Sequence, residues 1–403
     1  MRRAKGDEGG GVVTVAVDRD RTFLDTVCRI AEESAAPNAD DVDRVGRFPV
    51  EAITALREAR ALSAAIPAEL GGGGVSFATI AAACFELGRR CGSSAMVFAM
   101  HQIKIASIMR HVGDSVWLTG YLERVAAEQR LVASVTTELG TGGDLGRSIA
   151  AVTPAAGGVC TFEKQAPVIS YGSHADDMFV TLRRDPEAAQ NDQVAAVVCQ
   201  GQFTLEQTSD WDVMGMRGTC SPGYVLRARI APEQVIPSPF SRMLAETVVP
   251  VTHILWSQLW LGIATDAFER ARAFVRAGAR QNPDGPTIAA VKLSHLLSDL
   301  VMLRAEVGAG LAEFVASSDD AGRAGLSTMS AALRFNSLKI AAADHAAGVC
   351  RGAMEICGIS GFRNNGPHSV GRHLRDAMSA SLMIANDRIH QTNASLLAIA
   401  KDV

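Results

Sequence analysis

The chain has 403 residues, of which 48% are hydrophobic and 20% are charged, and its formal net charge is −4. These values indicate a globular protein with ample core, and the absence of a basic run argues against a nucleic-acid partner. No apolar stretch of membrane-spanning length is free of charged residues, so we expect no transmembrane helix.

Residues 1–18 are expected to be a disordered tail, because their charges are followed by glycines and not by the apolar core of a signal peptide. The eight cysteines are scattered, with no CxxC and no companion histidine spacing. This pattern predicts free thiols in a reducing cytoplasm, without disulfides and without a metal site.

Residues 19–130 are predicted to be a helical domain. Apolar residues recur at helical spacing over 21–33, and Pro49 stands where proline starts a helix. Ser76 is a candidate N-cap for a helix that ends at Leu87. A further helix is expected over 115–128.

Residues 131–236 are predicted to be a small β-domain, because β-branched residues become frequent and glycine, proline and asparagine interrupt them about every 8–12 residues. The predicted strands are 131–136, 159–162, 168–171, 178–182, 194–199, 203–207 and 224–230. Short strands at this spacing are typical of an antiparallel barrel or sandwich.

Residues 237–403 are predicted to be a four-helix bundle. Its expected helices are 244–279, 287–317, 326–357 and 377–400. Helices of roughly 30 residues are about 45 Å long, and bundles of this kind often bury their remaining face by oligomerising. The fold class is therefore α+β, and a homodimer or homotetramer is expected.

A glycine-rich loop follows the first predicted strand. Glycine occupies three of the four positions 140–143, which allows positive φ angles and lets backbone N–H groups approach a ligand closely. Such a loop can wrap an anion or a planar heterocycle. It can equally be a glycine-rich hairpin, and the loop by itself does not decide between them.

The order of the three parts resembles the acyl-CoA dehydrogenase superfamily of flavoproteins. Five local motifs agree with this resemblance, at residues 48–74, 137–144, 214–221, 355–362 and 375–377. Thr137-Glu138-Leu139-Gly140-Thr141-Gly142-Gly143-Asp144 resembles the family's Thr-Glu-Pro-x-x-Gly-Ser-Asp loop and departs from it at Leu139 and Gly143. Arg375-Asp376-Ala377 is the family's Arg-Asp-Ala.

The resemblance implies an FAD between the β-domain and the bundle, with the adenine end reaching a neighbouring subunit. By position, Val135, Thr136 and Thr137 would line the isoalloxazine, and Gly142 and Gly143 would approach the pyrophosphate.

Ser170 would hydrogen-bond flavin N5. Donors near N1, O2 and N5 favour the reduced, anionic flavin. The alternative for Thr137 and Ser170 is that they are strand surface residues.

The adenine side of the implied site departs from the family. Glu355 replaces the usual glutamine, and a carboxylate near a pyrophosphate is unfavourable unless it faces a hydroxyl or a cation. Arg280 is the candidate cationic partner. Gly358 and Asn386 complete the expected cofactor-binding set.

The catalytic base that the resemblance implies is missing. Most members have a glutamate nine residues after the arginine of Arg-Asp-Ala, because the weakly acidic α-proton of a thioester needs a positioned carboxylate. That position is Ile384 here, and the position of the base in a smaller group, on the first bundle helix, is about Thr252. Neither residue can abstract a proton.

Three residues are considered as replacements. Asp387 lies one helical turn beyond Ile384, although such a residue is more often a helix-surface charge. With Ser170, His101 resembles an arrangement in flavin monooxygenases of the same superfamily, although a histidine on a helix is often simply buried and hydrogen-bonded. His253 is the third.

The leading hypothesis is FAD-dependent oxidation of an acyl thioester, carried by CoA or a carrier protein, with a non-standard base. The alternative is a reduced-flavin-dependent monooxygenase of the same fold, and the second alternative is a non-catalytic member. Expected partners are an electron-transfer protein or a flavin reductase, with no nucleic acid and no membrane.

Overall fold

The computed structural model describes residues 9–279 and 287–400 of the chain. The N-terminal helices are α1 (Gly9–Ile30), α2 (Ala39–Val45), α3 (Val50–Glu58), α4 (Phe77–Arg90), α5 (Gly92–Arg110) and α6 (Val116–Glu128). Ser76 caps α4 as expected, since its side chain accepts from the Thr79 N–H.

The first helix starts within the segment that was expected to be a disordered tail. α1 begins at Gly9, so residues 9–18 are helical, and residues 1–8 lie outside the described part. The buried side chains of Val27 and Ile30 fix the end of this helix in the core. A helix that is held at one end extends at little cost, because each added residue gains a hydrogen bond.

The central part contains two small sheets in the described residues. Its strands are β1 (Val132–Val135), β2 (Thr153–Ala155), β3 (Val159–Ala166), β4 (Asp177–Arg183), β5 (Gln193–Val198), β6 (Phe203–Gln207) and β7 (Tyr224–Ile230). One sheet has the order β1-β4-β5 and the other β2-β3-β7-β6. The described strand pairs are antiparallel except β1 with β4, which run parallel.

One predicted strand, 168–171, is a turn. Pro167 ends the β3 ladder, because proline has no N–H to donate, and Tyr171 adopts a left-handed conformation with φ +44°. The Tyr171 N–H donates to Thr219 O at 2.7 Å. The turn thereby joins the end of β3 to the segment before β7.

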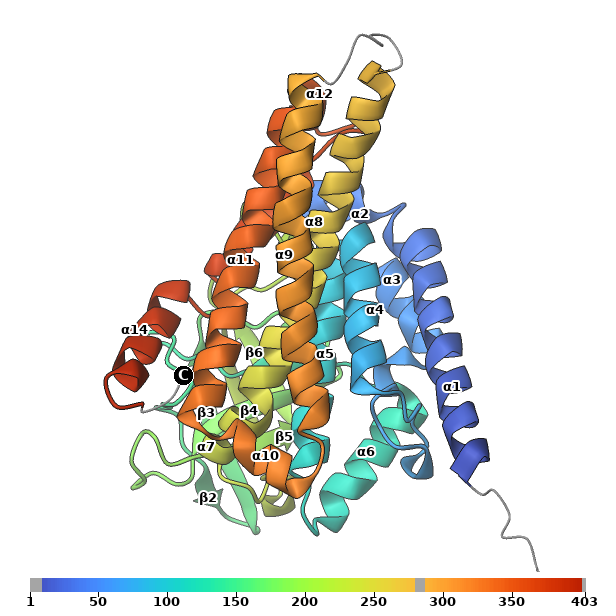
Figure 1. Ribbon diagram of the computed structural model, residues 1–403. Coiled ribbons are helices and arrows are strands. Elements are labelled where there is room, and N and C mark those ends of the chain that lie inside the picture. Colours follow the sequence, from blue (N-terminus) through green and yellow to red (C-terminus); the bar gives the residue numbers. More distant parts are fainter. Residues whose placement is uncertain (1–8, 280–286, 401–403) are drawn as a thin grey trace, which may run out of the picture.

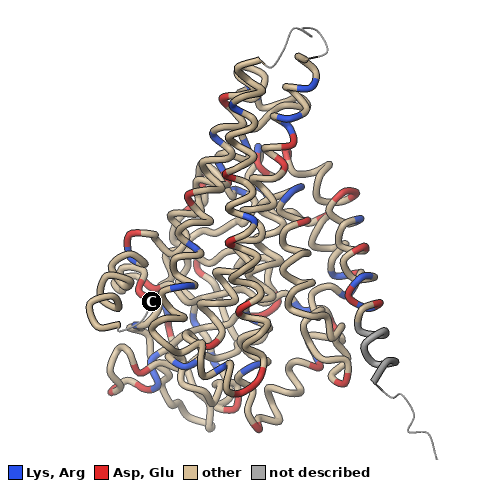
Figure 2. The backbone as a smooth tube through the Cα atoms, in the orientation of Figure 1, with Lys and Arg blue, Asp and Glu red and all other residues tan. Residues whose placement is uncertain are grey.

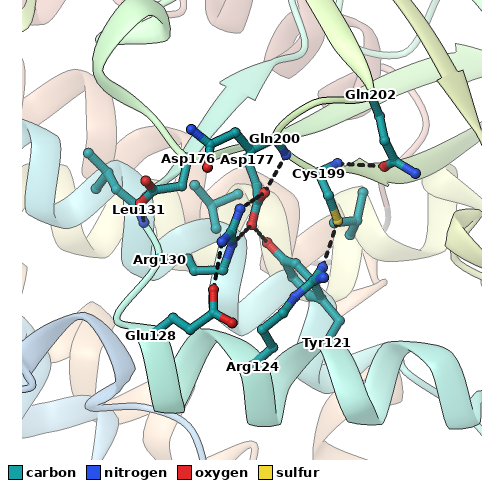
Figure 3. A network of polar contacts seen from close by, with 12 residues as sticks. Tyr121, Arg124, Glu128, Arg130, Leu131, Asp176, Asp177, Cys199, Gln200 and Gln202 are labelled. Carbon is teal, nitrogen blue, oxygen red and sulfur yellow. Dashed lines mark hydrogen bonds and ion pairs between the residues drawn. The ribbon is translucent and has the colours of Figure 1, made fainter.

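A buried polar network joins α6 to the first sheet (Figure 3). The Asp177 carboxylate, at the start of β4, accepts from Arg130 Nε at 2.6 Å, from Tyr121 Oη at 2.9 Å and from the Gln200 N–H at 3.0 Å. Several donors on one buried carboxylate satisfy its charge. The network therefore fixes β1, which follows Arg130 directly, against β4.

The C-terminal part is dominated by three long helices that run side by side (Figure 1). They are α8 (Val249–Ala279), α9 (Ile288–Ala316) and α11 (Met329–Cys357). The shorter elements are α7 (Phe240–Met243), a π-helical stretch Leu244–Val248, α10 (Asp320–Leu326), α12 (Ile359–Phe362), α13 (Gly371–Met378) and α14 (Asn386–Leu397). We keep 19–130, 131–236 and 237–403 as the proposed domain division.

The predicted helix over 377–400 is broken. α13 ends at Met378, a 3₁₀ turn and an irregular stretch follow, and α14 begins only at Asn386. Ile384 has φ +50°, a value that an α-helix cannot accommodate. α14 lies beside α11, on the side away from α1 (Figure 1), and the break between α13 and α14 forms one wall of the cavity described below.

A long apolar helical stretch of the described chain lies in the protein core. The stretch Phe240–Ala279 is apolar enough to span a membrane by composition, but 94% of its most apolar window is buried inside the protein. Acidic and basic residues are interspersed over the helices and strands (Figure 2). All eight cysteines are free.

Candidate functional site

A cavity of about 610 Å³ lies where the β-domain, α5, the start of α8 and the α13–α14 break meet. This volume is in the usual range for a site that binds a small molecule or cofactor. The cavity brings together five of the residues predicted for the cofactor, which are Thr136, Thr137, Gly142, Gly143 and Ser170.

The glycine-rich loop presents free backbone donors to this cavity. Gly142 and Gly143 have φ angles of +62° and +83°, and among the described residues no acceptor bonds to either N–H. A Cβ at Gly143 would meet nothing within 4 Å, so the approach to its backbone is open. Successive free N–H groups of this kind form a concave anion site.

A buried carboxylate holds the loop in this shape. Glu138 accepts hydrogen bonds from Ser148 Oγ at 2.7 Å, from the Ile149 N–H at 2.9 Å and from the Ala150 N–H at 2.6 Å, and it pairs with Lys164 Nζ at 3.3 Å. Burial favours a higher pKa for Glu138, but the charge of Lys164 and these hydrogen bonds outweigh it and hold the pKa below its usual value.

Replacing Glu138 by glutamine should lower the free energy of unfolding by about 3 kcal/mol, because it leaves the buried Lys164 cation without its counter-charge. Urea denaturation measures this change. The matched control is Glu163→Gln, which removes a half-exposed ion pair with Arg227 and should cost less than about 1 kcal/mol. Equal losses of unfolding free energy in the two variants would show that the buried contacts of Glu138 do not stabilise the loop more than a surface ion pair would.

Ser170 is the outer member of a chain of three hydroxyl groups. Ser221 Oγ donates to Ser170 Oγ at 2.9 Å, and Thr219 Oγ1 lies 2.8 Å from Ser221 Oγ and donates to Met216 O. Because Ser170 Oγ accepts a hydrogen bond from the Ser221 hydroxyl, the O–H of Ser170 is available to donate into the cavity. The geometry therefore supports the expected donor role and excludes a strand surface residue.

The donors that line the cavity fit a flavin. The N–H groups of Gly142 and Gly143 have no acceptor among the described residues, and the Ser170 hydroxyl lies in the same lining. A flavin carries acceptor atoms on its ring system and on its phosphate, which such donors can bind. The residues present therefore fit the flavin that the sequence predicts.

The ionisable lining of the cavity is cationic. Lys104, Arg375 and Arg388 line it, whereas no aspartate, glutamate or histidine does so in the described part of the chain. Arg375 is paired with Asp43, and Arg388 donates to Gly142 O. The described lining therefore offers neither a carboxylate nor an imidazole to abstract a carbon-bound proton.

Ile384 occupies the wall in which the resemblance implies a base. Its side chain lines the cavity beside Met383 and Leu382, and its carbonyl oxygen accepts from Lys339 Nζ at 2.7 Å. Lys339 also donates to Asn386 Oδ1 at 2.7 Å. The buried ammonium thus fixes the end of the break where α14 begins, and the side chains of this wall are apolar.

The three replacement bases do not reach the cavity. Asp387 is exposed and does not line it. His101 is fully buried, its Nε2 lies 2.7 Å from Leu62 O and its Nδ1 accepts from the Val132 N–H, so it is a satisfied structural histidine. His253 is also buried outside the lining and is held by Phe335 O at 2.9 Å.

Several predicted cofactor residues also lie elsewhere. Val135 is buried in the core and does not line the cavity, although its neighbours Ser134 and Thr136 do. Glu355 and Gly358 are exposed at the end of α11 and do not line the cavity, and Asn386 is buried against Lys339. The predicted partner Arg280 lies outside the described residues.

Sequence reasoning missed Lys104. Met96, Met100 and Lys104 follow one another at intervals of four residues, so they share one face of α5, and all three line the cavity. A lysine on an otherwise apolar helix face was the available signal. It was not used because lysine usually reaches solvent from such positions.

Two family models match the chain. The model of the acyl-CoA dehydrogenase N-terminal domain matches residues 18–129, and that of the acyl-CoA dehydrogenase C-terminal domain matches residues 250–391. The matched segments flank the strands and contain α5, most of α8 and the α13–α14 break, which form one part of the cavity wall, while residues between the two matched segments form another.

Relatives include both dehydrogenases and monooxygenases. Cyclohex-1-ene-1-carbonyl-CoA dehydrogenase from Syntrophus aciditrophicus is 25% identical over 94% of this chain and 90% of that protein. The probable FMNH2-dependent monooxygenase SfnC from Pseudomonas putida is 26% identical over 90% of this chain and 92% of that protein. The crystal structure of FMN-bound TdsC from Paenibacillus sp. A11-2 superposes with a TM-score of 0.79 at 19% identity, covering 93% of this chain and 97% of that one.

Proposed function

Because the chain belongs to the acyl-CoA dehydrogenase superfamily, we propose that it is a flavin-dependent oxidoreductase that works as a reduced-flavin monooxygenase. The flavin would bind in the cavity between the β-domain, α5 and the α13–α14 break. This proposal reverses the order of the two leading hypotheses from the sequence, and the composition of the cavity wall is the reason.

The absence of a carboxylate and an imidazole from the described lining carries the proposal. Desaturation of an acyl thioester requires removal of a weakly acidic α-proton, for which a positioned base contributes about 10²–10⁴-fold. Ile384 cannot supply it, and Asp387, His101 and His253 lie outside the lining. Oxygen transfer from a reduced flavin does not depend on a base for a carbon-bound proton.

The chain's own residues have distinct roles in this proposal. The free N–H groups of Gly142 and Gly143 and the Ser170 hydroxyl would bind and orient the flavin, which when bound supplies two-electron chemistry and oxygen activation. Met383 and Ile384 contribute an apolar wall that keeps water from the reacting atoms.

FMN is the form of flavin that we favour over the expected FAD. The implied adenine side of an FAD site would place its pyrophosphate near Glu355, and an exposed carboxylate there disfavours a second phosphate. FMN is also the flavin bound by the relative TdsC. Chromatography of the flavin released from the purified protein distinguishes FMN from FAD.

Dehydrogenation of an acyl thioester is the second candidate. It is supported by the similarity to a CoA-thioester dehydrogenase over 94% of the chain. An electron-transfer protein would then be the partner, whereas a monooxygenase needs a flavin reductase.

The test compares the two reactions in one preparation. The flavin-loaded protein should remain oxidised under anaerobic conditions with a panel of acyl-CoA esters. The protein is then supplied with reduced FMN, isotope-labelled molecular oxygen and each member of a panel of small aromatic and amine substrates. For at least one substrate, the product should contain one labelled oxygen atom. Anaerobic bleaching by an acyl-CoA would favour the dehydrogenase, and no labelled product from any substrate would refute the monooxygenase.

A cytoplasmic homo-oligomer is the proposed state of the protein. All eight cysteines are free, as expected in a reducing compartment. α9 exposes large apolar side chains at Ile288, Val301 and Met302, which a second copy of the chain would cover. Light scattering distinguishes a dimer from a tetramer.

A further inference from the structure

Three lysines are buried in the described part of the chain, and two of them have partners within it. Lys164 donates to Thr181 O at 2.6 Å, and Lys339 donates to Ile384 O at 2.7 Å. Lys104 is 5% exposed, yet within the described residues its ammonium has neither a hydrogen-bond acceptor nor a carboxylate partner. The only electrostatic contact described for this ammonium is a cation–π contact, in which Lys104 Nζ lies 5.1 Å from the centroid of the Phe179 ring.

An unpaired buried ammonium needs a compensating group. A cation over an aromatic face gains less free energy than an ion loses on leaving water. Lys104 lines the cavity, so a ligand there can supply the missing anion. Burial also lowers the pKa of Lys104 to about 8, which leaves it protonated at neutral pH.

The position of Lys104 assigns this anion to the substrate and not to the flavin phosphate. Arg388 donates to Gly142 O and lines the cavity beside the glycine loop, so a cation is already present where a flavin phosphate would meet the loop. Lys104 belongs to another wall, made by α5, and its ammonium lies over the ring of Phe179 behind that wall. The polar side chains of Ser134 and Thr252 line the same cavity and can bind further oxygen atoms.

We propose that Lys104 is the counter-ion for an ionised oxygen, a carboxylate or a phenolate, on the substrate of this enzyme. This inference adds the charge of the substrate to the proposed function. It depends on that function only in calling the bound anion a substrate. The binding of an anion by the cavity can be measured without turnover. A purely aliphatic acyl chain would leave the ammonium unpaired, so such chains are poor ligands.

Benzoate and benzamide are the matched probes, because they differ in charge but hardly in shape. Titration calorimetry on the flavin-loaded protein and on the flavin-free protein should show benzoate binding at least about tenfold more tightly than benzamide. Lys104→Met should remove this preference and leave benzamide binding unchanged, whereas Lys104→Arg should keep part of it. The flavin dissociation constant is measured for each variant and should stay within about twofold.

Several outcomes would overturn the assignment. Equal binding of the two probes to the wild type, or no benzoate binding to either form, refutes it without need of a variant. Loss of flavin affinity in Lys104→Met with the benzoate preference retained would move the anion to the flavin phosphate and also refutes it. If the wild type binds no flavin but the benzoate preference is present and is lost in Lys104→Met, the proposed function fails while Lys104 remains an anion site.

Discussion

Lowering the pH from 6.5 to 4 should reduce the free energy of unfolding by at least about 3 kcal/mol, because several histidines, His101 and His253 among them, are buried as neutral imidazoles. Burial lowers the pKa of His111 and His373 in the same direction. His101 is 0% and His253 is 1% exposed. Burial lowers the pKa of His101 from 6.5 to about 4 and that of His253 to about 3. Protonation of His101 would also turn its Nδ1 from an acceptor of the Val132 N–H into a donor that faces another donor.

The sign of this stability change depends on whether the folded or the unfolded state binds the proton of each group more strongly. Between pH 6.5 and about 4 the unfolded chain protonates these histidines and the folded protein does not, so stability falls as the pH falls. Each histidine contributes about 1.4 kcal/mol per pH unit, or about 3 kcal/mol over the window. Asp376 opposes this, because burial raises its pKa from 3.8 to about 6 and the folded state therefore gains its proton first.

Two substitutions should change the loss of unfolding free energy at acidic pH in opposite directions. His253→Leu removes one titrating site and should flatten the pH dependence by about 3 kcal/mol, whatever the loss of the His253 Nδ1 hydrogen bond to Phe335 O costs at pH 7. Asp376→Asn keeps an oxygen for the Met216 N–H, which is 2.7 Å away, and should steepen the dependence by a similar amount. Urea denaturation at several pH values measures all three proteins. A flat wild-type profile, or no response to His253→Leu, would contradict this account.

The sequence predicted the extent of most elements because local signals and burial agree there. The predicted strands 203–207 and 224–230 coincide with β6 and β7, and the predicted helix 287–317 matches α9 within one residue at each end. Ser76 was identified correctly as a cap because its hydroxyl satisfies the Thr79 N–H locally.

The failures occur where distant contacts override the local pattern. The segment after Met378 has helix-forming residues, but Lys339 holds Ile384 O and Asn386 from another helix and fixes the break. Spacing in the sequence does not reveal such a bond. His101 was misjudged for the same reason, since its partners Leu62 and Val132 are far away in the chain. Thr136, Thr137, Gly142 and Gly143, which the sequence predicts for the cofactor, line the cavity, and the positive φ angles of the two glycines come from the loop itself.

Replacing Ile384 by glutamate should make the bound flavin reducible by an acyl thioester. The side chain at 384 lines the cavity, and its backbone is fixed by Lys339 Nζ on the carbonyl oxygen. Its φ of +50° is unfavourable for a β-branched residue, so the unbranched glutamate relieves strain at the same position. A carboxylate introduced there would be the only carboxylate among the described lining residues.

We expect butyryl-CoA to bleach Ile384→Glu anaerobically at least about 100-fold faster than the wild type, which is the lower end of what a positioned base contributes. Ile384→Gln is the matched control, because it has the same shape without a base, and it should bleach no faster than the wild type. Flavin content, measured from visible absorbance, should be equal in the three proteins because Ile384 donates no hydrogen bond to a ligand. Rapid bleaching of the wild type would show that a base exists outside the described lining, and the monooxygenase proposal would then lose its main support. If Ile384→Glu binds flavin and butyryl-CoA but stays oxidised, residue 384 does not face the α-carbon, and the missing glutamate cannot be what separates this chain from the dehydrogenases.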